Sequence, residues 1–126
     1  MDKLHEISLT LPAVQEDLLI VRLTLSGLGM LAGLDKDMIG DLGTVANECC
    51  DCLIHQPVVP RAIRMEACVS EGKLHACFLA EGQAGTGDKN ALDLEIVRGV
   101  LETLMPEVKL QTDHRGVCGI FCSMAV

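Results

Sequence analysis

The chain has 126 residues and a net charge of −8, and hydrophobic residues make up 49% of it. This length predicts one domain, residues 1–126, with a core of its own, and this composition excludes a disordered chain. A nucleic-acid-binding surface needs clustered Lys and Arg, whereas the ten basic residues here are scattered, so we expect no nucleic-acid partner. The acidity suits a protein partner with a basic face.

No apolar run reaches the roughly 20 residues that a membrane-spanning helix needs. The opening residues, MDKLHEISLTLP, lack the apolar stretch of a signal peptide. We therefore expect a cytoplasmic protein with no membrane partner. The seven cysteines are an odd number in such a chain, which argues against a disulfide framework. With two Phe and no Trp or Tyr, the core must be mainly aliphatic.

The N-terminal half predicts a strand followed by two helices. Alternating apolar residues indicate a strand that Pro12 stops. A helical period follows and ends at Gly33, which is typical of a C-cap. Asp35 then suits the N-cap of a second helix whose apolar positions repeat at spacings of three and four. The expected elements are a strand over 4–11, a helix over 13–32 and a helix over 35–56.

The C-terminal half predicts two hairpins separated by a helix. Gly72 lies where the first hairpin needs a positive φ, and a Gly-rich loop over 81–90 precedes the helix. The expected elements are strands over 61–69 and 73–80, a helix over about 91–105, and strands over 107–112 and 117–124. An antiparallel or mixed sheet with the helices on one face buries three amphipathic helices, so we predict an α+β two-layer sandwich.

Two segments resemble the anti-sigma-factor serine kinases, namely VRLTLSGLGMLAGLDKDMIGDLGTVANECCDCLIHQ (21–56) and LETLMPEVKLQTDHRGV (101–117). These kinases belong to the GHKL superfamily of histidine-kinase-like ATPases. The resemblance implies the Bergerat fold, with a mixed but mostly antiparallel sheet and three helices on one face. It further implies a homodimer that regulates transcription by partner switching and phosphorylates a small antagonist protein with Mg²⁺-ATP.

Two nucleotide-site positions of that family fall on the second predicted helix. The resemblance implies that Glu48 matches the general base and that Cys52 stands where an Asn holds Mg²⁺. The i, i+4 spacing puts both side chains on one helix face. A neutral thiol is a poor ligand for a hard cation, so the metal position is lost. The alternative for Glu48 is a partly exposed carboxylate without a role as base.

The remaining nucleotide positions lie on strands and loops. The resemblance implies that Ala80 replaces the Asp that binds adenine, although Glu81 and Gly82 are retained after it. Cys118 replaces a Thr on the last strand. The family's phosphate-cradling glycines have no counterpart before the third helix, and 85–87 (Gly-Thr-Gly) is either a substitute cradle or a tight turn. The family's site has four parts: the Glu and Asn on the second helix, the adenine-binding turn, the phosphate-cradling glycines and the Thr on the last strand. With three of these four parts changed, we expect a degenerate nucleotide site.

Arg22 interrupts an otherwise apolar helix within a Val-Arg-Leu-Thr sequence that matches the family. An arginine on such a face is costly unless it pairs with an acid. The resemblance implies a surface that grips the sigma factor or its antagonist, with Arg22 as a partner-binding residue. A salt bridge to Glu16, Asp17 or another local acid is the alternative.

The segment CCDCLIH (49–55) has the residue types of a metal site. On a helix, however, Cys49 and Cys50 project about 100° apart, so these thiols do not all converge on one ion. We interpret the cysteines as small buried hydrophobic side chains and predict no metal site. A zinc or redox role, with Cys52 and His55 as two ligands, is the alternative.

These observations favour an anti-sigma-factor-like regulator that binds a sigma factor or an anti-sigma-factor antagonist and needs no cofactor. The first alternative is an active ATP-dependent serine kinase, with Glu48 as its base and Mg²⁺-ATP as its cosubstrate. A weaker alternative is a cysteine-based redox or metal sensor on the same scaffold.

Overall fold

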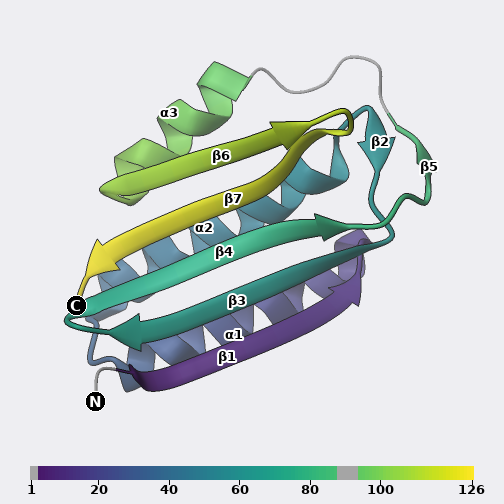
Figure 1. Ribbon diagram of the computed structural model, residues 1–126. Coiled ribbons are helices and arrows are strands. Elements are labelled where there is room, and N and C mark those ends of the chain that lie inside the picture. The colour runs from purple at the N-terminus through teal and green to yellow at the C-terminus, as the bar shows by residue number, and fades with distance from the viewer. Residues whose placement is uncertain (1–2, 88–93) are drawn as a thin grey trace.

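The computed structural model describes residues 3–87 and 94–126, which form an α+β structure with one main sheet (Figure 1). This sheet has the strand order β1-β3-β4-β7-β6, and every strand pair in the described residues is antiparallel. Its strands are β1 (Lys3–Pro12), β3 (Ala62–Ser70), β4 (Lys73–Glu81), β7 (Gly116–Ala125) and β6 (Glu107–Asp113). The predicted α+β class and order of the main elements are confirmed.

The three helices lie on the same side of this sheet. They are α1 (Leu18–Leu31), α2 (Lys36–Ile54) and α3 (Leu94–Leu104). In Figure 1, α1 and α2 run behind the sheet, and α3 packs against α2 and β6. The core lies between the sheet and this helix layer and is filled by aliphatic side chains around Phe78. No helix in residues 3–87 and 94–126 is long and apolar enough to span a membrane.

The helix boundaries are set by the capping residues that the sequence indicates. Gly33 has a φ of +82°, its N–H donates to the Met30 carbonyl, and the next N–H donates to Gly29, which closes α1 as a Schellman motif. The Asp35 carboxylate accepts from the Met38 N–H at 2.9 Å and starts α2. A short 3₁₀ helix, η1 (Gln15–Asp17), stands where the first helix was predicted to begin.

The first hairpin turns through Glu71 and Gly72, both with positive φ, as a type I′ turn requires. One feature was not predicted: β2 (Val58–Val59) pairs with β5 (Gly85–Thr86) in a two-stranded sheet. The loop prediction for 81–90 is wrong at these two residues, because two-residue strands leave no periodic signal. The predicted start of the third helix, at residue 91, lies outside the described residues.

Five of the seven cysteines are buried, as expected for small core side chains: Cys49, Cys50, Cys52, Cys118 and Cys122. Burial raises the pKa of the Cys50 thiol to about 12 and that of Cys52 to about 11. Such thiols are protonated at neutral pH, whereas a metal ligand or a redox nucleophile must be a thiolate. Within the described part of the chain, no group of three or more His, Cys, Asp or Glu is placed to hold a metal ion.

Candidate functional site

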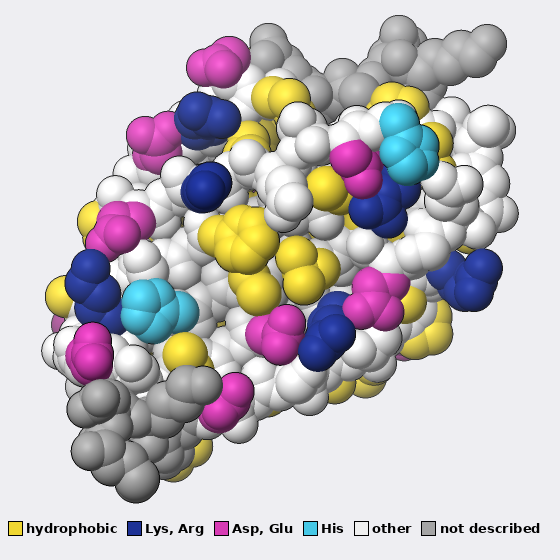
Figure 2. Space-filling view, viewed as in Figure 1, with side chains coloured by type: hydrophobic (Ala, Val, Ile, Leu, Met, Phe, Trp, Pro, Cys, Tyr) yellow, Lys and Arg dark blue, Asp and Glu magenta, His cyan; other side chains and the backbone are white. Residues whose placement is uncertain are grey.

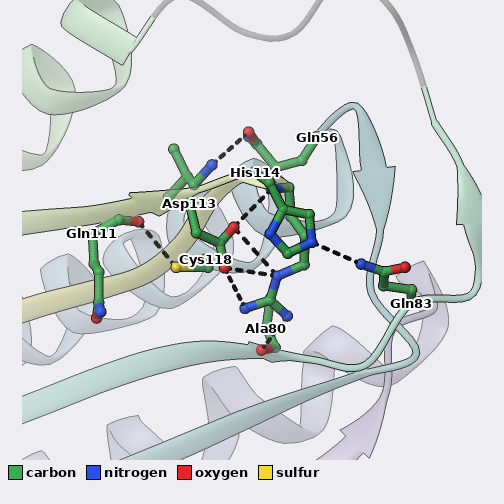
Figure 3. A network of polar contacts seen from close by, with 9 residues as sticks. Gln56, Ala80, Gln83, Gln111, Asp113, His114 and Cys118 are labelled. Carbon is green, nitrogen blue, oxygen red and sulfur yellow. Dashed lines mark hydrogen bonds and ion pairs between the residues drawn. The ribbon is translucent and has the colours of Figure 1, made fainter.

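The end of the sheet where β4 stops and β7 starts carries four of the six positions that the family resemblance assigns to a nucleotide site (Figure 3). Ala80 and Glu81 finish β4, with Gly82 directly after them, and Cys118 lies near the start of β7. The two strands pair up to Leu79 opposite Gly119. Cys118 itself lies at a bulge in the pairing of β6 with β7. The fold therefore brings the Ala80 and Cys118 regions together.

Arg115 occupies this strand end. Its Nη1 donates to the Ala80 carbonyl oxygen at 3.3 Å, while its Nε and Nη2 donate to the Asp113 carboxylate at 3.0 and 2.8 Å (Figure 3). The Cys118 thiol donates to the Gln111 carbonyl at 3.5 Å. Hydrogen bonds from Arg115 lower the pKa of Asp113 to about 2. The polar groups beside Ala80 are thus already bound to one another.

Gln56 follows α2 and hydrogen-bonds to the start of β7 (Figure 3), and no sequence pattern had indicated it as a site residue. Its side chain is 2% exposed. Its Nε2 donates to the Cys52 carbonyl at 2.7 Å, and its Oε1 accepts from the Val117 N–H at 2.9 Å. A Cβ at Gly116, whose φ is +100°, would collide with this Oε1. A short polar bridge therefore ties the end of α2 to the last strand.

The structure places Glu48 and Cys52 in different surroundings. Cys52 is fully buried, and its Sγ lies 3.6 Å from the Gln56 Nε2. Glu48 is partly exposed and lines a hollow of about 340 Å³ between α1 and α2, together with Arg22 and Asp51. None of the residues that line this hollow comes from β4 or β7. Glu48 therefore shares a surface with Arg22.

Helix α1 is apolar on two faces. One face packs in the core through Leu18, Val21, Leu25 and Leu28. The other face is open to solvent and consists of Leu19, Ile20, Leu23, Met30 and Leu31. Leu23 is 61% exposed and Met30 is 67% exposed. A helix that is apolar all round is normally buried, and a contiguous exposed apolar face marks an interaction site. We call these five exposed residues the α1 apolar face.

Arg22 lies beside the α1 apolar face. Its side chain crosses α2 at Gly43, where an added Cβ would come within 3.0 Å of the Arg22 Nε. Among the described residues, no carboxylate pairs with Arg22. The alternative of a salt bridge to Glu16, Asp17 or another local acid is therefore wrong. This guanidinium lines the same hollow as Glu48 and is free to meet a carboxylate from outside the chain.

The helix layer around the α1 apolar face is strongly acidic. Residues 15–54 contain seven acidic and two basic side chains, which accounts for five of the eight net negative charges. None of the nine is buried. The helix layer therefore presents the α1 apolar face with Arg22 beside it and acidic side chains around both.

Comparison of the chain with family models and with curated proteins finds no match. The function is therefore argued from two structural features. These are the strand end closed by Arg115 and Gln56, and the α1 apolar face with Arg22.

We expect Gln56→Leu to lower the free energy of unfolding by about 2 kcal/mol, because it leaves the buried Val117 N–H without an acceptor. Gln83→Leu is the matched control, since the Gln83 side chain makes only an exposed contact with His114. We expect a change of less than about 0.5 kcal/mol there. Urea denaturation measures both values, and equal effects would show that the Gln56 bridge contributes nothing.

We expect the Asp113 carboxyl to titrate near pH 2 in the folded protein, against about 3.9 when unfolded. Its stabilising effect is therefore complete above about pH 4 and is lost as the pH falls from there to about 2. Arg115→Gln removes the guanidinium and should move the pKa of Asp113 up toward the unfolded value. Carbon NMR of the Asp113 carboxyl measures this, and an identical pKa in the variant would rule out Arg115 as the cause.

Proposed function

We propose that this protein is an anti-sigma-factor-like regulator with a Bergerat fold and a degenerate nucleotide site. It acts in the cytoplasm by binding a sigma factor or an anti-sigma-factor antagonist. The observation that carries the proposal is the α1 apolar face with Arg22 beside it. Arg22, Leu23, Met30 and Leu31 fall in the segment that resembles the family, whereas Leu19 and Ile20 directly precede it.

The chemistry of the helix layer supports protein binding. Covering a leucine that is exposed in the free protein contributes about 1.5–3 kcal/mol at most, so the five apolar residues supply ample driving force. The unpaired Arg22 adds direction, because a guanidinium makes two parallel hydrogen bonds to a suitably placed carboxylate. The acidic surround favours a partner whose remaining contact surface is basic. Arginine and large apolar side chains are frequent at the centres of protein interfaces.

The strand end supports binding without nucleotide. The family's adenine-binding carboxylate is replaced by Ala80, and the adjacent carbonyl accepts from Arg115. Glu81 lies within 3.7 Å of Arg64. Gly85–Thr86 pairs with β2, so its backbone is committed to a small sheet and does not form a phosphate cradle. A nucleotide would have to displace these contacts, and the proposed mode of action therefore requires no cofactor.

The proposal is tested with purified sigma factors and antagonist proteins from the source organism, each measured singly by biolayer interferometry. We expect one of them to bind, and we expect Leu23→Glu to weaken that binding at least tenfold because it places a charge in the apolar contact. Arg22→Ala should weaken the binding as well, because the variant lacks the guanidinium that would pair with the partner's carboxylate.

Phe121→Glu is the matched control, because it adds the same charge on the opposite side of the molecule. It should leave the affinity for the partner within about twofold, since distant sites act independently. Binding that is equally strong in Leu23→Glu and in the unchanged protein would contradict the proposal. Absence of binding to every sigma factor and antagonist would do so too.

A further inference from the structure

The sheet face opposite the helices is uncovered in the described part of the chain (Figures 1 and 2). Alternate residues of each strand point to this side, and the strand register arranges them in rows across the sheet. The middle of one row is formed by Cys68, His75 and Ser123. The next row contains, from β3 to β6, Glu66, Cys77, Phe121 and Lys109. Both rows line one hollow of about 650 Å³, which we call the sheet hollow.

The sheet hollow has an apolar wall and an open floor. The wall is Phe121, which is 38% exposed and lies opposite the partly exposed Cys77. The Phe121 ring lies over Gly119, where an added Cβ would come within 3.2 Å of the ring Cε2. The ring therefore leans away from Ser123 and leaves the floor between Cys77 and Ser123 uncovered. Figure 2 shows hydrophobic side chains gathered in the middle of this view and charged ones around them. A flat apolar body fits such a slot beside an aromatic ring.

The size of the sheet hollow suits a small molecule. Small-molecule sites are concave, mostly apolar hollows of roughly 300–1,000 Å³ in which a few polar groups orient the ligand. The volume of about 650 Å³ lies within this range. Most of the lining residues belong to the five strands of the main sheet, so the hydrogen-bonded strands fix the shape of the hollow.

The charges that line the sheet hollow are separated by sign. Glu6 on β1 and Glu66 on β3 line one side, and Lys109 on β6 lines the other. Glu107, also on β6, is held by Lys73 at 2.8 Å. In residues 3–87 and 94–126, no carboxylate pairs with Lys109. A ligand with one positive charge is therefore attracted to the β1–β3 side and repelled from the β6 side.

Glu66 retains capacity for a second cation. Its Oε2 lies 3.5 Å from the Arg64 Nη2, and the two side chains are 41% and 43% exposed. An exposed pair of this length is weak, and an ionised carboxylate accepts about four hydrogen bonds, so a further positive charge is still attracted. The remaining acid of the lining, Glu102 on α3, adds to the negative potential. Four carboxylates and one lysine thus line the hollow, and they disfavour an anionic ligand.

We propose that the sheet hollow binds a small organic cation with a flat apolar body. The body lies over Cys77 against the Phe121 ring. The positive group lies on the β1–β3 side near Glu66, and Lys109 disfavours the reverse orientation. The sheet hollow and the α1 apolar face lie on opposite layers of the molecule. The inference therefore goes beyond the proposed partner binding and does not depend on it.

Fluorescence titration with naphthylethyl trimethylammonium tests the inference. This probe joins a flat apolar body to a permanent positive charge, and the chain has no Trp or Tyr to mask its signal. We expect saturable binding to the unchanged protein. Naphthylpropionate carries the opposite charge on the same body and should bind at least about tenfold more weakly.

Four variants test where the probe lies. Phe121→Ser removes the apolar wall and should weaken binding at least about tenfold. Glu66→Gln should weaken binding about threefold, and Lys109→Gln should strengthen it about threefold, because exposed charge pairs have effects of this size. Leu23→Ser shortens a side chain of the α1 apolar face and is the matched control, with an affinity within about twofold of the unchanged protein. Glu66 and Lys109 are at least partly exposed, so their variants remain informative if Phe121→Ser fails to fold.

Thiol labelling locates the probe independently of charge. Cys68 and Cys77 are the two cysteines that are partly exposed, and both line the sheet hollow. Saturating naphthylethyl trimethylammonium should slow their reaction with a chromogenic disulfide reagent. Leu23→Ser should show the same protection.

Several results would overturn the inference. They include no saturable binding of the cation up to roughly 1 mM, and equal affinity for the cation and for naphthylpropionate. Binding that is lost in Leu23→Ser and kept in Phe121→Ser would place the probe on the α1 apolar face instead. Labelling of Cys68 and Cys77 that the probe does not slow would place it elsewhere. An affinity for the probe that falls as the protein concentration rises would show that another protein surface covers the hollow.

Discussion

Packing all three helices against one face of a five-stranded antiparallel sheet determines what this chain exposes. The shared core takes one face of α1 and one face of the sheet, through residues such as Leu25 and Phe78. The second apolar face of α1 and the Phe121 side of the sheet are left outside it. Both are larger apolar surfaces than scattered single side chains, and both have charged surroundings that select what covers them. Function is therefore expected on the outside of both layers.

The two surfaces differ in charge. The helix layer has an excess of acids around an unpaired Arg22, so it suits a basic protein that offers one carboxylate. On the sheet face opposite the helices the charges are nearly balanced, because Lys73 pairs with Glu107 and Arg64 lies near Glu66. The strand end beside Ala80 differs from both surfaces, because its polar groups are hydrogen-bonded within the chain by Arg115 and Gln56.

Local signals in the sequence were sufficient for the main elements and insufficient for the site. Gly33, Asp35 and Gly72 act within a few residues, so capping and turn rules found the boundaries that they set. Gln56 instead bonds Val117, 61 residues away, and no local pattern reports such a contact. The periodicity of α1 likewise found its buried face but not the exposure of Leu23, because exposure depends on where the other elements pack. The i, i+4 spacing of Glu48 and Cys52 predicted one shared helix face. In the structure, however, Cys52 is buried in the core and Glu48 is partly exposed, so the two side chains have different environments.

The central claim is that the protein works by binding other proteins and has no use for nucleotide. Calorimetric titration of the purified, reduced protein with Mg²⁺-ATP and with Mg²⁺-ADP tests this claim most directly. The account predicts no heat of binding up to about 1 mM nucleotide, a limit that corresponds to about 4 kcal/mol of binding free energy. Binding with a Kd of roughly 1 µM would contradict it and would make Glu48 the candidate base of an active kinase.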